Sequence, residues 1–343
     1  MNAPFFLPRS TRRAGWFVAV LLAGSITLTQ QKWVGGVTLY APEHQARRDV
    51  IHQSILTNEL PDSVRNWSSL GANGLSARLL VVMAAEGIHR ATGSSLRRSY
   101  LFIETVALFA CCLLLYAFLE QYAGIPFALA GLLYFGTVLP LTYLNHYFHP
   151  WDRPSIATWL LALIFAWRRS WVALAVVLAI GVAIKYDIVV FPLLVFLAFR
   201  TTDPPRVNLA RAGGLMAVTG FTYALLRWFA PNGFEPRPLG AQVARNLEAL
   251  SQTLYLYPPL LALGLPAVLA AVGYSRSDQF ARACVWLAVV VAAILFLQTN
   301  FVEFRAEVPL LLLLLPSAWH GFQRLTSTSR PTGDPVPLVK DNR

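Results

Sequence analysis

The sequence predicts an all-helical, polytopic integral membrane protein with about ten transmembrane helices. Of the 343 residues, 56% are hydrophobic and only 13% are charged, whereas about a quarter of the residues of soluble domains are charged. Apolar segments recur along the whole chain, and the basic residues fall in short clusters between them. Because cytoplasmic loops of membrane proteins show this pattern, we attribute the net charge of +11 to them and not to nucleic-acid binding.

The first apolar segment covers about residues 14–29 and follows Arg9, Arg12 and Arg13. A secretory signal peptide is the alternative to a membrane helix here. However, no small-x-small cleavage site follows the segment, and several membrane segments come later. We therefore expect an uncleaved first helix with a cytoplasmic amino terminus.

Residues 75–90 decide the predicted topology. About eleven residues separate Arg78 from Arg90, which as a helix covers roughly 16 Å of a hydrocarbon core about 30 Å thick. Glu86 lies between them, and at about 100° per residue these three side chains and His89 share one face. We interpret the segment as an interfacial amphipathic helix. A crossing of the membrane is the alternative.

With that choice, nine further spans follow the first. They cover about residues 99–119, 125–144, 154–167, 171–184, 187–199, 210–230, 252–273, 283–298 and 308–322. The side of the amino terminus then holds 14 Lys or Arg against 5 Asp or Glu, and the other side holds 14 against 12. This agrees with the positive-inside rule, although Arg97 and Arg98 lie on the outer side.

The predicted organisation is a single transmembrane domain, residues 1–325, and a disordered cytoplasmic tail, residues 326–343, rich in Ser, Thr and Pro. No soluble part of the chain is large enough to form an active site by itself, so we expect an active site where the outer loops meet the helices. The unusual polar residues fall in outer stretches that should converge on one face. These are the first extracytoplasmic loop, 30–98, and the stretches 145–155, 185–187, 231–250 and 298–307.

In residues 14–200, one helix is followed by a long outer loop that opens with Tyr40-Ala41-Pro42-Glu43, runs through Leu60-Pro61 and ends in an interfacial helix before short spans. This layout resembles that of the GT-C superfamily of membrane glycosyltransferases. The stretch Gly181-Val182-Ala183-Ile184-Lys185 is similar to the Gly-rich helix ending in Thr-Lys of bacterial members. Where the family has an Asp-Glu pair this chain has Glu43-His44, and Ile184-Lys185 replaces Thr-Lys.

The resemblance implies transfer of a sugar from a polyprenyl-phosphate-linked donor to a glycan, lipid or protein acceptor. The reaction would take place on the outer face of a bacterial cytoplasmic (inner) membrane. It implies no certain cofactor, and a divalent metal is possible but not indicated. The main alternative is a transporter or flippase for lipid-linked or small anionic substrates, which inverted repeats would favour; we find none. A noncatalytic assembly subunit is a third possibility.

Sugar transfer from a phosphate needs a carboxylate that accepts the proton of the acceptor hydroxyl. Glu43 is the first candidate for this base and Asp49 the second. If residues 43–52 are helical, Arg47 lies one turn from Glu43 and lowers the pKa of its carboxyl group, whereas a dry pocket raises it. The alternative for Glu43 is a solvated loop acid or a partner of Arg47.

The departing phosphate needs cations, and we assign Lys185 and Arg305 to it. Lys185 lies between two apolar runs, where a charge is costly and usually functional if it faces a cavity. Its alternatives are a snorkelling lysine or a partner of Asp187. Glu307 has a structural reason to stand at the start of the last helix, because acids are favourable at a helix amino terminus, whereas Arg305 is freer to contact a phosphate.

The stretch His149-Pro150-Trp151-Asp152-Arg153-Pro154 is the densest cluster of special residues. We expect its four polar or aromatic side chains to bind substrate: Asp152 a hydroxyl or a cation, and Trp151 a sugar face by stacking. The alternative is a helix entry capped by Asp152 or Ser155. A metal site with His146 is disfavoured, because Pro150 breaks the helix that would align the ligands. Of the remaining polar residues, His52 shows nothing that separates it from an ordinary exposed residue.

Overall fold

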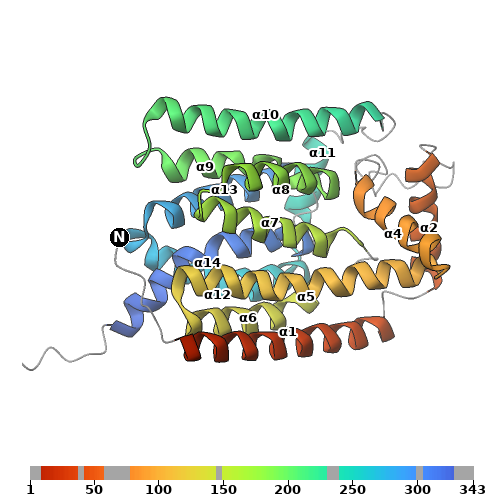
Figure 1. The fold of residues 1–343 in the computed structure, drawn as a ribbon, viewed down its shortest axis with the longest axis horizontal. Coiled ribbons are helices and arrows are strands. Elements are labelled where there is room, and N and C mark those ends of the chain that lie inside the picture. The colour runs from red at the N-terminus through yellow and green to blue at the C-terminus, as the bar shows by residue number, and fades with distance from the viewer. Residues whose placement is uncertain are drawn as a thin grey trace, which may run out of the picture.

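The structure is a computed structural model that describes residues 9–37, 42–57, 78–143, 149–229, 239–298 and 304–327. Throughout these ranges every regular element is a helix and none is a strand, so the predicted all-helical class is confirmed. Most helices run side by side along one axis, which is horizontal in Figure 1. Three others gather at one end of this bundle, at the right of Figure 1.

Each of the ten apolar segments expected from the sequence forms a helix of the bundle. In chain order these helices are α1 (Arg9–Val37), α5 (Leu96–Ala123), α6 (Ile125–Val138), α7 (Asp152–Trp167), α8 (Trp171–Ile184), α9 (Pro192–Phe199), α10 (Pro205–Phe229), α12 (Thr253–Gly273), α13 (Gln279–Gln298) and α14 (Phe304–Ser327). Short 3-10 helices extend or join them: η2 (Leu139–Tyr143), η3 (Tyr186–Val190) and η5 (Tyr274–Arg276).

Six of the described helices are long and apolar enough to cross a membrane. They are Ser10–Lys32, Leu96–Ala123, Ile125–Thr142, Pro205–Phe229, Leu256–Arg276 and Gln279–Leu297. Two shorter apolar helices, Trp171–Ile184 and Tyr186–Phe199, lie among them. Several helices of this kind are typical of a multi-pass membrane protein. The count of ten crossings stays a prediction.

The helices pack around an apolar core, and in one place glycines allow two of them to approach each other closely. Trp159 of α7 is fully buried, and its ring meets that of Phe191 edge to face, with 5.7 Å between the centroids. α12 and α14 approach so closely that a Cβ atom on Gly321 would collide with the backbone of Leu269. At the same crossing, Ser317 donates a 3.0 Å hydrogen bond to the carbonyl oxygen of Ala270.

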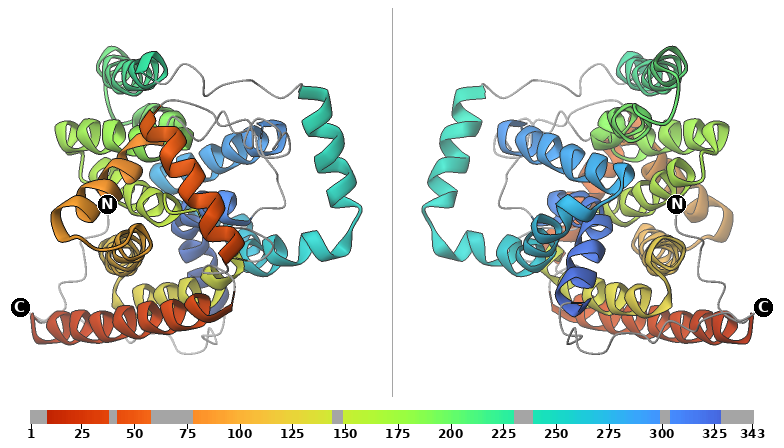
Figure 2. Two further views of the ribbon diagram at one scale, coloured as in Figure 1. Left: turned by 90° about the vertical axis from the view of Figure 1, so that its right-hand side faces the viewer. Right: turned by 90° about the vertical axis from the view of Figure 1, so that its left-hand side faces the viewer.

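The three helices at the right-hand end are α2 (Pro42–Thr57), α4 (Leu79–Thr92) and α11 (Leu239–Leu250). α4 spans about 21 Å, less than the roughly 30 Å of a hydrocarbon core. It is amphipathic as expected, with Val82 buried and Arg90 exposed. α2 lies across the end of the bundle (Figure 2). An interfacial position of α4 relative to a membrane stays a prediction.

The junctions between bundle helices lie at the two ends of the bundle, and which end faces the cytoplasm stays a prediction. Those expected on the cytoplasmic side lie at the left of Figure 1, where Arg12 pairs with Glu120 at 2.6 Å and Arg169 with Asp203 at 2.9 Å. Part of the predicted outer loop 231–250 is the helix α11. The predicted tail lies outside the described residues from position 328 onward.

Candidate functional site

Two cations and two carboxylates meet at the right-hand end of the bundle. Lys185 Nζ lies 3.4 Å from Asp152 Oδ1 and 3.2 Å from Asp187 Oδ2. Arg305 Nη1 lies 3.5 Å from the other oxygen of Asp152. The two central residues are nearly covered, Asp152 being 8% exposed and Lys185 7%. The structure therefore brings together three residues that the sequence placed on separate outer stretches.

The turn between α8 and η3 positions Lys185. α8 ends at Ile184, and Lys185 takes an extended conformation with φ −161° and ψ 117°. This lets η3 fold back against α8 so closely that a Cβ atom on Gly181 would lie only 3.0 Å from Ile188. A side chain at position 181 would press on the Ile188 side chain, so the glycine allows the tight return that leaves Lys185 between the carboxylates of α7 and η3.

Asp152 opens α7 but does not cap it. α7 begins at Asp152, its N-cap residue is Trp151, and no side chain there makes a capping hydrogen bond. The prediction that Asp152 or Ser155 caps the helix is therefore wrong. The physical reason is that the two Asp152 oxygens face Lys185 and Arg305, and Ser155 lies one turn inside the helix, where its backbone N–H donates to the carbonyl of Trp151.

A third cation acts on Asp152. The guanidinium of Arg78, just before α4, lies over the ring of Trp151 at 4.6 Å from the centroid. Burial favours a raised pKa for Asp152, but the positive charges of Lys185, Arg305 and Arg78 outweigh it and hold the pKa below its usual value. Arg153 adds a smaller effect in the same direction, so Asp152, which precedes the apolar part of its helix, is a counter-ion among four cations.

Trp151 and His149 pack behind this cluster. Trp151 is only 1% exposed and belongs to a small apolar cluster with Val82 and Tyr100. Its ring meets the imidazole of His149 at 5.5 Å between centroids. Since Arg78 covers one face of the Trp151 ring, a sugar would stack there only if Arg78 moved. In the structure, the Trp151 ring contacts the Arg78 guanidinium, and binding of a sugar to Trp151 stays a prediction.

Arg153 points to different partners from its neighbour Asp152. Its Nε lies 3.2 Å from Glu104 Oε1 of α5, and its Nη2 donates a 2.7 Å hydrogen bond to Thr142 Oγ1 of η2. Both charged side chains of this pair are buried. The pair joins α5, η2 and α7, so the contacts of Arg153 are those of helix packing.

α2 carries both candidate bases. The condition that residues 43–52 be helical holds for the backbone, since α2 covers Pro42–Thr57. The side chain of Glu43 lies outside the described residues, and Asp49 is exposed. A contact between Glu43 and a substrate therefore stays a prediction.

His52 is the residue that the sequence did not distinguish. We expected an ordinary exposed side chain, and this is wrong, because His52 is 0% exposed. Its Nδ1 lies 2.7 Å from Tyr100 Oη of α5, and its Nε2 lies 3.1 Å from Glu86 Oε2 of α4. Glu86 also accepts a 2.5 Å hydrogen bond from Arg90 Nε. Hydrogen bonds from Arg90 and then His52 hold the pKa of Glu86 below its usual value.

Counting Arg78, the cluster holds three cations against the carboxylates of Asp152 and Asp187, and so has one positive charge in excess. Lysine and arginine are the residue types that proteins use to bind phosphate, lysine as a point charge and arginine as a planar donor fork.

No family model, no curated protein and no solved structure matches the chain. No group of three potential metal-ligating side chains occurs within the described ranges, and His146 lies outside them.

Proposed function

We propose that the protein is a membrane glycosyltransferase that moves a sugar from a polyprenyl-phosphate-linked donor to an acceptor at the α2 and α4 end. The observation that carries the proposal is the convergence of Lys185 and Arg305, from separate elements, on the single carboxylate of Asp152. A phosphate that becomes a leaving group gains negative charge at the moment of transfer. Cations fixed beforehand at that position stabilise the transition state.

The geometry of the ion pairs supports this use of the cations. Their separations from Asp152, 3.4 and 3.5 Å, exceed the roughly 2.7–2.9 Å of strong charge-assisted hydrogen bonds. Asp152 therefore holds Lys185 and Arg305 in place mainly by charge. Binding of a donor phosphate to the two cations would therefore break no short hydrogen bond between either of them and Asp152.

The proposed reaction is a single displacement at the anomeric carbon of the sugar. The oxygen of the acceptor hydroxyl forms a bond to that carbon, and the bond from the carbon to the donor phosphate breaks. The electron pair leaves with the polyprenyl phosphate, beside Lys185 and Arg305. The hydroxyl proton passes to a carboxylate, for which Glu43 in the first turn of α2 remains the first candidate and Asp49 the second.

The end of the bundle that holds this cluster would face away from the cytoplasm. The positive-inside rule supports this orientation, because the opposite end carries the larger excess of Lys and Arg over acids. In a bacterial cell the membrane would be the cytoplasmic one. A transporter or flippase would use the same cations to bind the same anion, so the deciding difference is whether a bond is made.

The test compares lipid-linked sugars in cells that lack the protein and in cells restored with one of three forms at equal abundance. The forms are the wild type, Glu43→Gln, and Glu248→Gln as a control at an exposed acid of α11. We expect a prenyl-phosphate sugar to accumulate without the protein and with Glu43→Gln only. Equal restoration by all three forms would remove Glu43 as the base, and no change in any lipid-linked sugar would overturn the transferase.

A further inference from the structure

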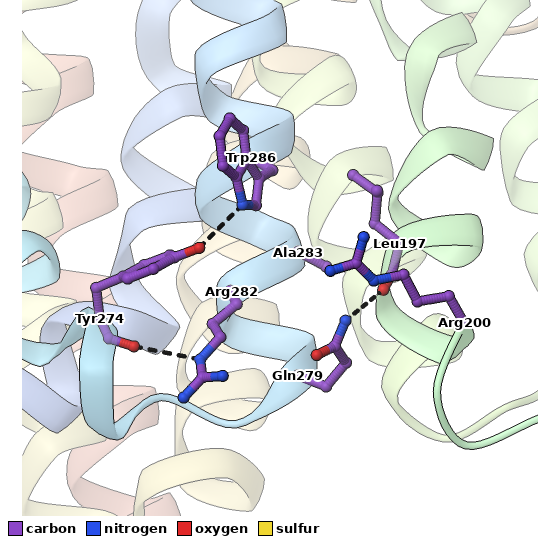
Figure 3. Close-up of a pocket in the computed structure, with 7 residues that line it drawn as sticks. All are labelled: Leu197, Arg200, Tyr274, Gln279, Arg282, Ala283 and Trp286. Atoms are coloured by element: carbon purple, nitrogen blue, oxygen red, sulfur yellow. Dashed lines mark hydrogen bonds between the residues drawn. The ribbon is translucent and has the colours of Figure 1, made fainter.

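A second charged site lies at the opposite end of the bundle, far from the cluster around Asp152. A cavity of about 130 Å³ opens between the end of α9, η5 and the start of α13 (Figure 3). Arg200 and Arg282 both line it, together with Tyr274, Gln279 and Trp286. A single water occupies about 30 Å³ in the liquid, so the cavity has room for a group of several heavy atoms.

The two arginines of the cavity differ in how they are held. Arg282 donates hydrogen bonds to the carbonyl oxygens of Tyr274, at 3.3 Å, and Ser275, at 2.9 Å. Arg200 reaches toward Ala283 in Figure 3 and makes no hydrogen bond or ion pair with any residue in the described ranges. Arg282 is thus a fixed part of the wall, and Arg200 is available to a ligand.

The acids at this end of the bundle are already occupied. Asp203 pairs with Arg169 and Arg211. Asp278 accepts hydrogen bonds from Tyr122 Oη at 3.1 Å and from the backbone N–H of Ala281 at 2.8 Å. No acidic side chain in the described part of the chain lines the cavity. The cavity therefore carries an uncompensated positive charge.

The aromatic wall of the cavity is of the kind found at the level of lipid headgroups. Trp286 lies in the first turns of the membrane-crossing candidate Gln279–Leu297 and is 53% exposed. Its Nε1 donates a 2.9 Å hydrogen bond to Tyr274 Oη. Tryptophan and tyrosine with one apolar and one polar end concentrate at the boundary between hydrocarbon and water.

We propose that this cavity binds a phosphate group, supplied by the headgroup of an anionic phospholipid of the cytoplasmic leaflet. Basic pockets between transmembrane helices on the cytoplasmic side recognise such headgroups. Arg200 is the phosphate ligand, Arg282 adds positive charge, and the exposed ring of Trp286 lies along the acyl chains. The proposal is independent of the proposed glycosyltransferase activity, since it concerns the other end of the bundle.

The experiment uses the purified full-length protein in detergent, offered phosphatidylglycerol or phosphatidylcholine, with bound lipids counted by native mass spectrometry. The variants are Arg200→Gln, Arg200→Lys and, as a matched control, Arg206→Gln, an exposed arginine of α10 that does not line the cavity. Because Arg200 is exposed and makes no bond to the described residues, its replacement should not impair folding, which thermal unfolding checks.

We expect preferential retention of phosphatidylglycerol by the wild type, by Arg200→Lys and by Arg206→Gln. Arg200→Gln should retain about fivefold less, as expected for the loss of one cation that acts on an anionic headgroup. Equal retention of both lipids, or an equal loss in Arg200→Gln and Arg206→Gln, would overturn the site. If millimolar inorganic phosphate abolishes the preference, the cavity binds free phosphate and the lipid assignment is wrong.

Discussion

Lys185 at the end of α8 lies 3.4 Å from Asp152 at the start of α7. The two residues are 33 positions apart in the chain, and each directly follows or begins an apolar helix. Arg305 reaches the same carboxylate from α14. One acid thus holds two cations from distant parts of the chain, and the proposed function depends on this relationship.

The buried pair of Arg153 and Glu104 should dominate the packing of α7 on α5. Glu104→Gln removes the negative charge 3.2 Å from the buried Arg153 guanidinium, so we expect a loss of about 3–5 kcal/mol in the free energy of unfolding. Replacing both, as Glu104→Leu with Arg153→Met, should recover most of that loss. Detergent-induced unfolding measures both. A double variant as unstable as the single one would contradict the assignment.

Glu86 should make stability depend on pH. Its pKa in the folded protein is depressed by Arg90 and His52 below the ordinary value of 4.5. The contribution is therefore fully present above pH 4.5 and is lost as the pH falls through the folded pKa. We expect the Tm of the wild type to fall in this acidic window more steeply than that of Glu86→Gln. Parallel Tm profiles of the two proteins would contradict it.

The predicted topology places Ser95, between α4 and α5, outside the cell. A cysteine at this exposed position should react with a membrane-impermeant maleimide in intact cells, whereas one at the exposed Thr201, at the other end, should not. The background is low, because the three native cysteines are buried. Labelling at Thr201 and protection at Ser95 would show the reverse orientation, and protection of Ser95 alone would favour a crossing by α4.

The contact of α12 with α14 depends on the absence of a side chain at Gly321. A methyl group there meets the backbone of Leu269, which cannot move without displacing α12. We expect Gly321→Ala to lower stability by about 1–3 kcal/mol. Gly264→Ala in α12 is the matched control, because nothing lies within 4 Å of the added Cβ atom. Equal unfolding of the two variants would show that the helices adjust.

The sequence predicted the helices better than the roles of the polar side chains. Apolar runs long enough to be helices were recognisable one by one, since their signal is local. Lys185 could be singled out as well, because a charge between apolar segments is unusual. The structure places it beside Asp152 together with Arg305, and phosphate binding by the two cations stays a prediction. The gathering of Arg78 and Trp151 behind them was not predicted, since it depends on how α4 meets α7.

The burial of His52 was not predicted either, because it also depends on contacts between distant parts of the chain. Its partners Glu86 and Tyr100 lie 34 and 48 positions away, so nothing near it in the chain indicates that it is buried. The spacing of His52 and Ile55 was a faint signal, because both face inward one helical turn apart. The prediction of a cap at Asp152 was wrong for the opposite reason. A local capping rule suggested it, but in the structure the two carboxylate oxygens face Lys185 and Arg305, which are distant in the chain.

The most direct test of the proposed function removes the charge of Lys185. Lipid-linked sugars are compared in cells that lack the protein and are restored with the wild type, with Lys185→Gln, or with Arg206→Gln as the control. We predict that a prenyl-phosphate sugar accumulates with Lys185→Gln as it does without the protein, and does not accumulate with the other two. Normal levels of every lipid-linked sugar with Lys185→Gln at wild-type abundance would contradict the assignment of Lys185 to the donor phosphate.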